Sequence, residues 1–494
     1  MKVVEIGLVL LYTSFQISAV YQDCPDVIIT SEYNKTGNFS SPQYPRNYPG
    51  NLKCLIKFVG GPNERVQINF TDFRLDGFPN ELIGVSTGCT NDYIDIYTEI
   101  EHPDHDILEL PLQGRYCGND ITRLPHLLMS SKQTLIITFD SDDDGKTARG
   151  FLGTYEFISD EPYNMGIPAS FGCGWTVNGE EKSEGYIMAP YYPAVYPDGL
   201  NCYYQLQGVP GQRIRLEFLD FDLYSGGDHT SADPLIGIYC SRIEGLVLYS
   251  TGHEMYLQFR TRQGRPSIEP VWGDKVITMS GFKARYTFSD EFVNLGFIVD
   301  GEHVQGSECD VRIKSQGESS GVIVSPGFPN SSPSNTTCHY FIDGLIDQDN
   351  LEKVVLTFEE AFLPGYLNRC KEGSAYVATY LYGQKATTSR PDHFLCDLEL
   401  PKMLTSHDPR LTLKYTTNSV QPGAMVGFKA KYQFTMDYAI EGTPANPIAS
   451  SDCHFIYRSS SDKSGKLNSP RYPSAYPNDI TCTYELVAQP MSSS

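Results

Sequence analysis

Alternating apolar and polar residues recur at matching places along the chain. Val66, Ile68 and Phe70 alternate with polar neighbours, and residues 214–218 and 354–358 repeat the pattern. Alternation with a period of two is typical of β-strands that bury one face and expose the other to water. The pattern therefore predicts an all-β fold and places Asn69 on an exposed face.

Two further strands return in the same order in each of the first three units. One lies at residues 135–139, 255–259 and 411–415. The other closes the unit with Gly-Phe-x-x-x-Tyr, at residues 150–155, 281–286 and 427–432. Many short strands separated by turn residues indicate an antiparallel sandwich.

Each unit opens with a proline-rich stretch between two cysteines. In the first unit it reads Ser-Pro-Gln-Tyr-Pro-Arg-Asn-Tyr-Pro at residues 41–49, and variants begin at Ala189, Ser325 and Ser469. Proline fixes φ and lacks an N–H, so this stretch cannot be a central strand. It predicts a crossing loop with its tyrosines packed beneath it.

The repeats divide the chain of 494 residues into four units. We predict domains at residues 24–158, 173–288 and 309–434 and a partial fourth at 453–494, joined by short polar linkers. Each of the first three is long enough to bury its own core. The net charge of −22 argues against a nucleic-acid partner, because phosphate binding needs a basic surface.

The N-terminus has the features of a secretory signal peptide, predicted at residues 1–19. Lys2 precedes an apolar stretch from Ile6 to Tyr12, and the small residue Ala19 follows. A buried N-terminal strand is the alternative. No later stretch of the sequence is long and apolar enough to span a membrane.

The 13 cysteines and the signal peptide indicate an oxidising compartment. We therefore predict a secreted protein or one on the extracellular face of the plasma membrane. Asn-X-Ser/Thr sequons agree with this location. These candidates for N-glycosylation are Asn34, Asn38, Asn69, Asn330 and Asn335.

Several spaced motifs together resemble the CUB domain, and the resemblance covers nearly the whole chain after residue 24. They are the cysteine pair, the proline-rich crossing, Cys-Thr-Asn-Asp-Tyr at 89–93, Gly-Arg-Tyr-Cys-Gly at 114–118 and the closing Gly-Phe-x-x-x-Tyr. The resemblance implies tandem CUB domains, each a jelly-roll-like sandwich of two antiparallel β-sheets.

The resemblance also implies that the first cysteine of a unit pairs with the second, and the third with the fourth. The implied disulfides are Cys24–Cys54, Cys89–Cys117, Cys173–Cys202, Cys309–Cys338, Cys370–Cys396 and Cys453–Cys482. Cys240 is left over, because Thr230 and its neighbours stand where its partner is expected. We predict a buried thiol there, and an intermolecular bridge is the alternative.

The fourth unit stops at Ser494, before its later strands and closing motif. Half a sandwich exposes strand edges, so we expect a fragment, a truncated gene model or a splice form, with room for a membrane anchor beyond it. Four such units without another module resemble the suppressor-of-lurcher type. That resemblance implies an auxiliary subunit of ionotropic glutamate receptors at synapses.

The family often holds a calcium ion at one end of the sandwich, where a hard cation finds several oxygens. Carried over by position, the implied ligands in the first unit are Asp76, Asp92 and Asp142. The resemblance implies that the ion orients these carboxylates for a Lys or Arg of a partner. A solvated acidic turn at 142–144 is the alternative, and the long insert 77–88 could displace Asp76.

The second and third units lack this acidic set. Tyr224 stands at the first position of the second unit, and the basic segment 260–265 replaces its acidic loop. The third unit has Gly373 at the second position and Thr416 and Thr417 in the late loop. We therefore predict calcium in the first unit only.

No motif points to catalysis. The chain has no His-Glu-x-x-His zinc motif, and His102 and His105 lie in a loop without a third ligand nearby in sequence. We predict a non-catalytic protein that binds the extracellular part of a membrane receptor or another protein. The alternatives are the CUB portion of a secreted protease or complement-like assembly, and a secreted adhesive or ligand-binding CUB protein.

Overall fold

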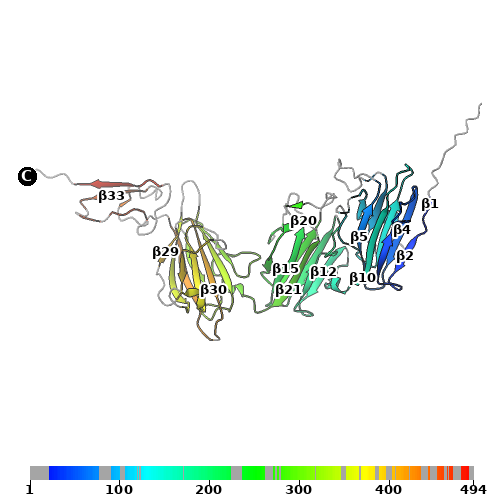
Figure 1. Cartoon of the computed structure of the whole chain (residues 1–494). Helices are drawn as coiled ribbons and strands as arrows, with labels where there is room; N and C mark the ends of the chain where they lie inside the picture. Colours follow the sequence, from blue (N-terminus) through cyan, green and yellow to red (C-terminus); the bar gives the residue numbers. More distant parts are fainter. Residues whose placement is uncertain are drawn as a thin grey trace, which may run out of the picture.

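The computed structural model shows three β-sandwiches followed along the chain by a smaller β unit (Figure 1). It describes residues 22–488 apart from 77–88, 90, 101–105, 120, 122–123, 171, 198, 224–235, 262–270, 273–274, 277–279, 318, 346–351, 366–368, 384–388, 397–402, 407, 422, 436–442, 445–452, 461–463, 466 and 471–479. The predicted signal peptide and the pair His102 and His105 lie outside the described residues.

The first unit contains the strands β1 (Gln22–Asp23), β2 (Val27–Thr30), β3 (Thr36–Ser40), β4 (Leu52–Val59), β5 (Glu64–Arg74), β6 (Tyr93–Tyr97), β7 (Gly114–Tyr116), β8 (Leu128–Met129), β9 (Thr134–Asp140) and β10 (Gly150–Ser159). One sheet has the order β1-β4-β9-β6-β7 with β2 beside β4, and the other has the order β3-β10-β5-β8. Val66, Ile68 and Phe70 of β5 are buried while Asn69 is exposed, as the alternation predicts.

The second unit contains β11 (Ile167–Pro168), β12 (Cys173–Asn178), β13 (Glu184–Met188), β14 (Asn201–Gln207), β15 (Arg213–Leu223), β16 (Ser241–Arg242), β17 (Val247–Tyr249), β18 (Glu254–Arg260), β19 (Val271–Trp272), β20 (Lys275–Val276) and β21 (Gly281–Ser289). Its sheets are β11-β12-β14-β18 and β13-β21-β15-β16, with β17 beside β15 and a separate pair β19-β20. The order β13-β21-β15 matches β3-β10-β5 of the first unit, so the two units share the topology of this sheet.

The third unit contains β22 (Glu302–His303), β23 (Val311–Lys314), β24 (Ser320–Val324), β25 (Thr337–Asp343), β26 (Lys353–Phe362), β27 (Ala375–Tyr380), β28 (His393–Leu395), β29 (Met403–Thr405), β30 (Arg410–Thr417) and β31 (Gly427–Thr435). Its sheets are β22-β23-β25-β30-β27-β28 and β24-β31-β26-β29. The fourth unit contains only β32 (Thr443–Pro444), β33 (His454–Arg458) and β34 (Thr483–Val487) among the described residues.

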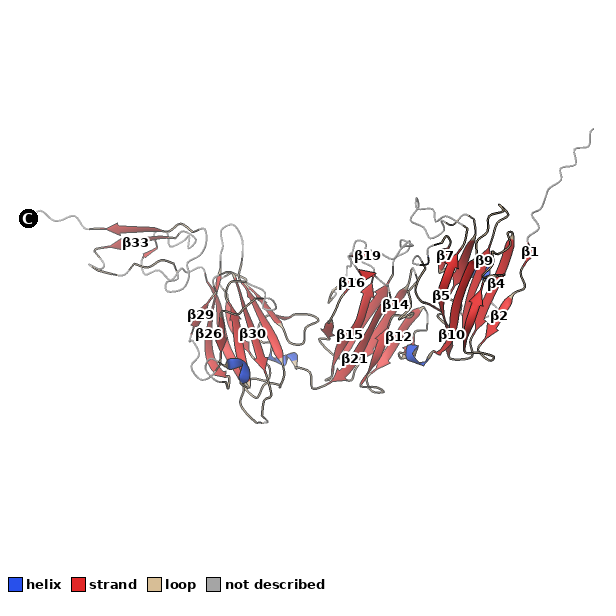
Figure 2. Ribbon diagram, in the orientation of Figure 1, coloured by secondary structure: helices blue, strands red, loops and turns tan. Residues whose placement is uncertain are grey.

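Helical structure in the described residues is limited to short 3-10 turns (Figure 2). They are η1 (Ile107–Glu109), η3 (Glu161–Tyr163), η4 (Leu295–Phe297) and η5 (Cys370–Glu372). None of the helices in the described part of the chain is long and apolar enough to cross a membrane.

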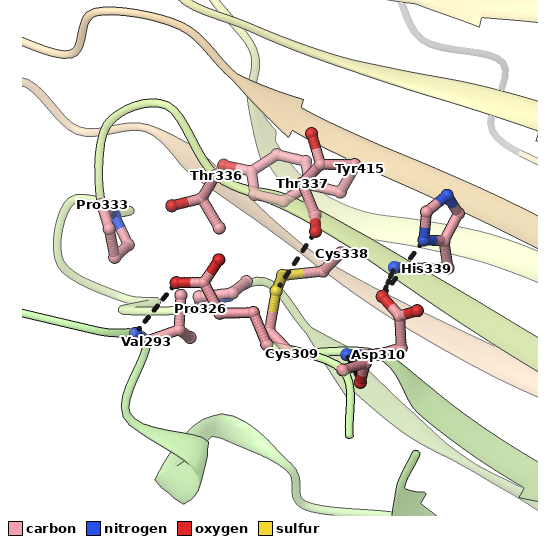
Figure 3. The surroundings of a disulfide bond; sticks show 12 residues. Val293, Cys309, Asp310, Pro326, Pro333, Thr336, Thr337, Cys338, His339 and Tyr415 are labelled. Carbon is pink, nitrogen blue, oxygen red and sulfur yellow. Dashed lines mark hydrogen bonds and ion pairs between the residues drawn. A yellow bond between two sulfur atoms is a disulfide. The ribbon is translucent and has the colours of Figure 1, made fainter. Parts of the chain in front are cut away.

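The proline-rich crossings and the disulfides lie where the sequence predicts them. Tyr48 and Tyr196 are 1 % and 3 % exposed beneath their crossing loops. All six implied cysteine pairs are bonded in the structure. Figure 3 shows the surroundings of the Cys309–Cys338 bond, where Pro326, Pro333 and Tyr415 lie around the two sulfur atoms. Cys240 is half-buried and lies outside these six bonds.

The linkers between units are packed, and this differs from the polar connectors that the sequence suggests. The turn η3 buries Tyr163, which is 7 % exposed, and η4 buries Phe297, which is 8 % exposed. An aromatic side chain buries a large apolar area, so each of these residues helps to hold its linker against a sandwich. The side chains of all five sequon asparagines are exposed, and their glycosylation stays a prediction.

Candidate calcium site in the first unit

The three predicted aspartates come together at one end of the first sandwich. Asp76 lies two residues after the end of β5, Asp92 precedes β6, and Asp142 lies in the turn after β9. Strands β6 and β9 are neighbours in one sheet, and β5 belongs to the opposite sheet. Loops from both sheets therefore contribute a carboxylate to the same end, which is the arrangement that the resemblance implies.

Asp92 is the centre of this arrangement. It is 1 % exposed, and its backbone N–H donates to the carbonyl oxygen of Asp76 at 2.9 Å. Its Oδ1 accepts from the backbone N–H of Asp142 at 2.9 Å, and its Oδ2 accepts from the Tyr48 hydroxyl at 2.5 Å. The Tyr48 oxygen in turn accepts from the backbone N–H of Asp76 at 2.8 Å.

The surroundings of Asp92 disfavour the ionised form of its carboxyl group. Burial raises the pKa of its carboxyl, and the nearby charges of Asp142 and Asp76 raise it further, while the bonds from Tyr48 and the Asp142 N–H act in the opposite direction. A raised pKa in the folded state means that ionisation costs stability as the pH rises through that pKa. Ionising Asp92 therefore costs the first unit stability, and a bound cation would offset that cost.

The backbone around Asp142 is fixed by two small residues. A side chain at Gly50 would place a Cβ 2.8 Å from the carbonyl oxygen of Asp142, so glycine permits this close approach. The hydroxyl of Ser141 accepts from the Leu52 N–H at 3.0 Å and donates to the Pro49 oxygen at 3.1 Å. Thr417 makes the same pair of hydrogen bonds in the third unit. This pair is therefore a feature of the fold and not of a metal site.

The rest of the acidic turn at residues 142–144 is solvated, which is the alternative to a calcium site that the sequence leaves open. Asp143 and Asp144 are exposed. The Asp144 carboxylate accepts from the backbone N–H of Lys146 at 2.8 Å, and Lys146 lowers the pKa of Asp144. Asp142 is therefore the residue of this turn that belongs to the Asp92 cluster.

The donor chemistry of the cluster fits a hard cation, although the side chains are not arranged as ligands. In the described part of the chain, no group of three or more His, Cys, Asp or Glu side chains is placed to hold a metal ion. Both oxygens of Asp92 already accept hydrogen bonds, and Asp142 Oδ1 accepts from the Asp144 N–H at 3.1 Å. The structure brings three negatively charged side chains together, and these carboxylates repel one another. Such a concentration of negative charge favours the binding of calcium.

The third unit has no carboxylate at any of the three positions. Its sheet register aligns Ala375 with Asp92, because Tyr93 and Tyr376 pair with equivalent residues of β9 and β30. The prediction that Gly373 takes this place is wrong, since the turn η5 inserts two residues before β27. The residues at the positions of Asp76, Asp92 and Asp142 are Pro364, Ala375 and Asn418. In the second unit, Tyr224 and most of segment 260–265 lie outside the described residues.

The model of the family described as "CUB domain" matches residues 29–155, 173–286 and 309–432. This chain belongs to the CUB domain family. The matched segments are named CUB1, CUB2 and CUB3 from here on. The predicted tandem CUB sandwiches are thereby confirmed, and the partial fourth CUB domain stays a proposal.

Curated relatives of the chain carry the same domain in longer proteins. Cubilin of Rattus norvegicus is 27% identical over 92% of this chain, and the dorsal-ventral patterning protein tolloid of Drosophila melanogaster is 26% identical over 62% of it. The matches cover 10% of that cubilin and 31% of that tolloid. This chain therefore spans a small part of the length of either relative.

Solved structures with CUB domains are also similar. The CUB1-EGF-CUB2 domains of rat MASP-1 align with 82% of this chain and 99% of that chain, at 16% identity and a TM-score of 0.21. The MASP-1 CUB2 domain bound to Ca2+ aligns with 26% of this chain and 96% of that chain, at 24% identity and a TM-score of 0.21. At these TM-scores the likenesses carry no conclusion about this chain.

Tyr48 is a site residue that a search for acidic ligands misses. It is the last tyrosine of the CUB1 crossing, and its hydroxyl joins Asp76 to Asp92. Its signal in the sequence is its place before Pro49, which by itself indicates packing alone. Burial raises the pKa of the Tyr48 hydroxyl, followed by its bond to Asp92, so the group stays a protonated donor.

Replacing Tyr48 with phenylalanine should destabilise CUB1 by about 1–3 kcal/mol, because the half-buried Asp76 N–H and a buried carboxylate oxygen of Asp92 each lose a partner. Chemical denaturation followed by far-ultraviolet circular dichroism measures the change. Tyr44→Phe is the matched control, since its hydroxyl donates to Asp72 at 2.8 Å on a more accessible part of the same crossing. Equal effects of the two substitutions would show that Tyr48 holds no special place in the cluster.

Proposed function

We propose that this CUB protein is an extracellular, non-catalytic protein-binding chain whose CUB1 domain presents a calcium-dependent binding end. The observation that carries the proposal is the buried Asp92 carboxylate, hydrogen-bonded to the backbone of Asp142 and joined through Tyr48 to Asp76. CUB3 has the same fold without these carboxylates. The acidic cluster is therefore a property of CUB1 and not a requirement of the sandwich.

Asp76, Asp92 and Asp142 would hold the calcium ion. A bound ion supplies positive charge among these carboxylates. Asp92 then stays ionised despite its burial, and the more exposed carboxylates of Asp76 and Asp142 keep a fixed direction at the surface. A Lys or Arg side chain of a partner can pair with such carboxylates, because an oriented charge pair loses little side-chain entropy on binding.

The extracellular location is supported by the cysteines and the sequons. The described residues contain six disulfides, and such bonds persist in oxidising compartments. The five sequon asparagines are exposed on the described surface. A signal peptide at residues 1–19 stays part of this proposal.

The partner is proposed only as an extracellular protein or the extracellular part of a receptor. An ionotropic glutamate receptor, which the suppressor-of-lurcher resemblance implies, rests on the number of units alone. The similarity to cubilin and tolloid gives that finer assignment no support. A chain that belongs to a secreted protease assembly, or an adhesive protein, would use the same CUB1 chemistry. These proposals therefore differ only in the partner, and a capture experiment identifies the partner.

Capture of partners by the immobilised, secreted chain tests the proposed function. Neuronal membranes and serum are the two protein sources, each applied with calcium and with a chelator. The proposal predicts partners that bind wild type in calcium and are lost both with chelator and with the Asp92→Asn, Asp142→Asn double variant. Asp143→Asn, which neutralises one carboxylate in the exposed turn, should bind as wild type does. Partners captured equally under all conditions would contradict a calcium-dependent binding end.

A further inference from the structure

A buried cation occupies the same place at the start of a long strand in each CUB domain. Arg65 is the second residue of β5, while Arg213 opens β15 and Lys353 opens β26, and they are 4 %, 6 % and 1 % exposed. Each follows Glu or Gln and precedes the first apolar residue of the strand. Buried cations are rare unless they are paired, so three at one repeat position call for a common cause.

Arg65 contacts the next domain directly. Its Nη1 donates to the carbonyl oxygen of Pro190, in the CUB2 crossing, at 2.8 Å, and its Nε bonds to Asp160 in the linker. Its guanidinium carbon lies 4.0 Å from the centre of the Tyr163 ring, and the Tyr163 hydroxyl donates to the Tyr192 oxygen at 2.8 Å. The arginine thus joins the end of CUB1, the linker and the first crossing of CUB2.

The junction is also apolar. Met129 at the end of β8 is 1 % exposed and belongs to the buried cluster formed by the CUB2 core. Tyr163 of the linker belongs to the same cluster, and its hydroxyl lies 3.4 Å from the Met129 sulfur. Tyr191 of the CUB2 crossing is 3 % exposed. The hydrophobic core of CUB2 therefore continues across the domain boundary.

Arg213 makes the corresponding contacts at the next junction. Its Nη1 donates to the carbonyl oxygens of Val293 at 2.6 Å and Glu308 at 2.7 Å. Val293 lies in the linker and belongs to the core cluster of CUB3, and Glu308 is the residue before Cys309. Beside these contacts, the backbone N–H of Tyr249 in CUB2 donates to the Gly306 oxygen at 2.9 Å.

We propose that this repeat position is a docking site for the following CUB domain, and that it couples CUB1, CUB2 and CUB3 into one stiff unit. The site recognises backbone carbonyls, which explains how one arginine position serves two junctions with different partner sequences. A guanidinium presents several donors in a rigid fork, so it can bond to its own domain and to the next at once. Lys353 is a buried cation at the same position of CUB3.

Hydrogen exchange of the full secreted chain tests the proposal at the CUB2–CUB3 junction. Arg213→Met removes the donors and keeps an apolar side chain of similar length. Exchange of the amides at 293–308 should become about tenfold to a hundredfold faster, because two charge-assisted bonds to this segment are lost. Exchange within β14 and the central part of β15 should stay as in wild type. Arg285→Met is the matched control, since Arg285 of β21 pairs with Glu217 of β15 at 2.7 Å, within CUB2.

A second variant disturbs the junction from the opposite side. Gly306 has φ of +83°, and a Cβ there would lie 2.7 Å from the Cγ2 of Ile236 in CUB2. Gly306→Val should therefore speed linker exchange as Arg213→Met does, even if the arginine variant folds poorly. Small-angle X-ray scattering of both variants should show a larger and more variable maximum dimension. Linker exchange at the wild-type rate in both variants would overturn the proposal, as would a loss of CUB2 core protection with an undisturbed linker.

Discussion

Replacing Asp92 with asparagine should abolish the stabilisation of CUB1 by calcium. In wild type, a site with a Kd of about 10⁻⁴–10⁻³ M stabilises the domain by about 1–2 kcal/mol at about 5 mM calcium, which raises the melting temperature by roughly 4–10 °C. The variant loses the buried carboxylate and its charge while keeping the side-chain shape. Thermal unfolding of the full chain, with and without calcium, measures the difference.

Asp143→Asn is the control for this substitution. Asp143 lies beside Asp142 in the same turn and is exposed, so its neutralisation changes the net charge equally without touching the cluster. We expect its calcium response to equal that of wild type. A calcium response that persists in Asp92→Asn, or that is lost equally in both variants, would mean that calcium acts on the surface charge of the chain and not at this cluster.

Removing the Cys309–Cys338 disulfide should destabilise CUB3 by about 2–5 kcal/mol and sharply reduce its secretion. The bond joins two cysteines that are 29 positions apart in the sequence, and both are 0 % exposed. Figure 3 shows it between the start of the domain and β25, where Asp310 also accepts from the His339 N–H at 2.8 Å. The double variant Cys309→Ser, Cys338→Ser leaves two buried hydroxyls and removes the cross-link that restricts the unfolded chain.

Cys240→Ser serves as the control because it makes the same chemical change at a half-buried cysteine outside the six disulfides. Its effect on the free energy of unfolding should stay within about 1 kcal/mol. Secreted yield and calorimetric unfolding of the full chain measure both results. A CUB3 transition that is unchanged in the double variant would show that the sandwich core alone sustains the domain.

The fold is predictable because its main signals are local and repeated. The period-two alternation in Val66, Ile68 and Phe70 sets which face of β5 is buried, and the proline-rich crossing excludes a central strand. The linkers are not predictable in this way. Tyr163 and Phe297 lie in short linkers, and only the neighbouring sandwich shows that each joins a hydrophobic core.

The candidate site is predictable in part. Spacing carried over from the family identifies Asp76, Asp92 and Asp142, and the structure brings them to one end of CUB1. Spacing alone misplaces Gly373, because a short turn shifts the register where the loop length differs. Tyr48 is harder to find, because a tyrosine in the proline-rich crossing indicates packing alone. Its hydroxyl bonds to Asp76 and Asp92, which lie in two loops distant from it in sequence.

Arg65 and Arg213 are hidden for a related reason. A cation at the start of a strand is usually solvent-exposed, so its burial is visible only when the next domain is in place. The repeat alignment of Arg65, Arg213 and Lys353 is nevertheless present in the sequence. A positive charge that recurs at one position of every complete repeat is the signal in the sequence that points to the junctions.

Calorimetric titration of the full secreted chain with calcium tests the central claim most directly. The account predicts one calcium ion per chain, bound by CUB1, and no binding in the Asp76→Asn, Asp92→Asn, Asp142→Asn variant. Wild-type protein that is folded by calorimetric unfolding and binds no calcium would contradict the proposed binding end. Calcium that still binds to the triple variant would place the ion elsewhere and contradict it equally.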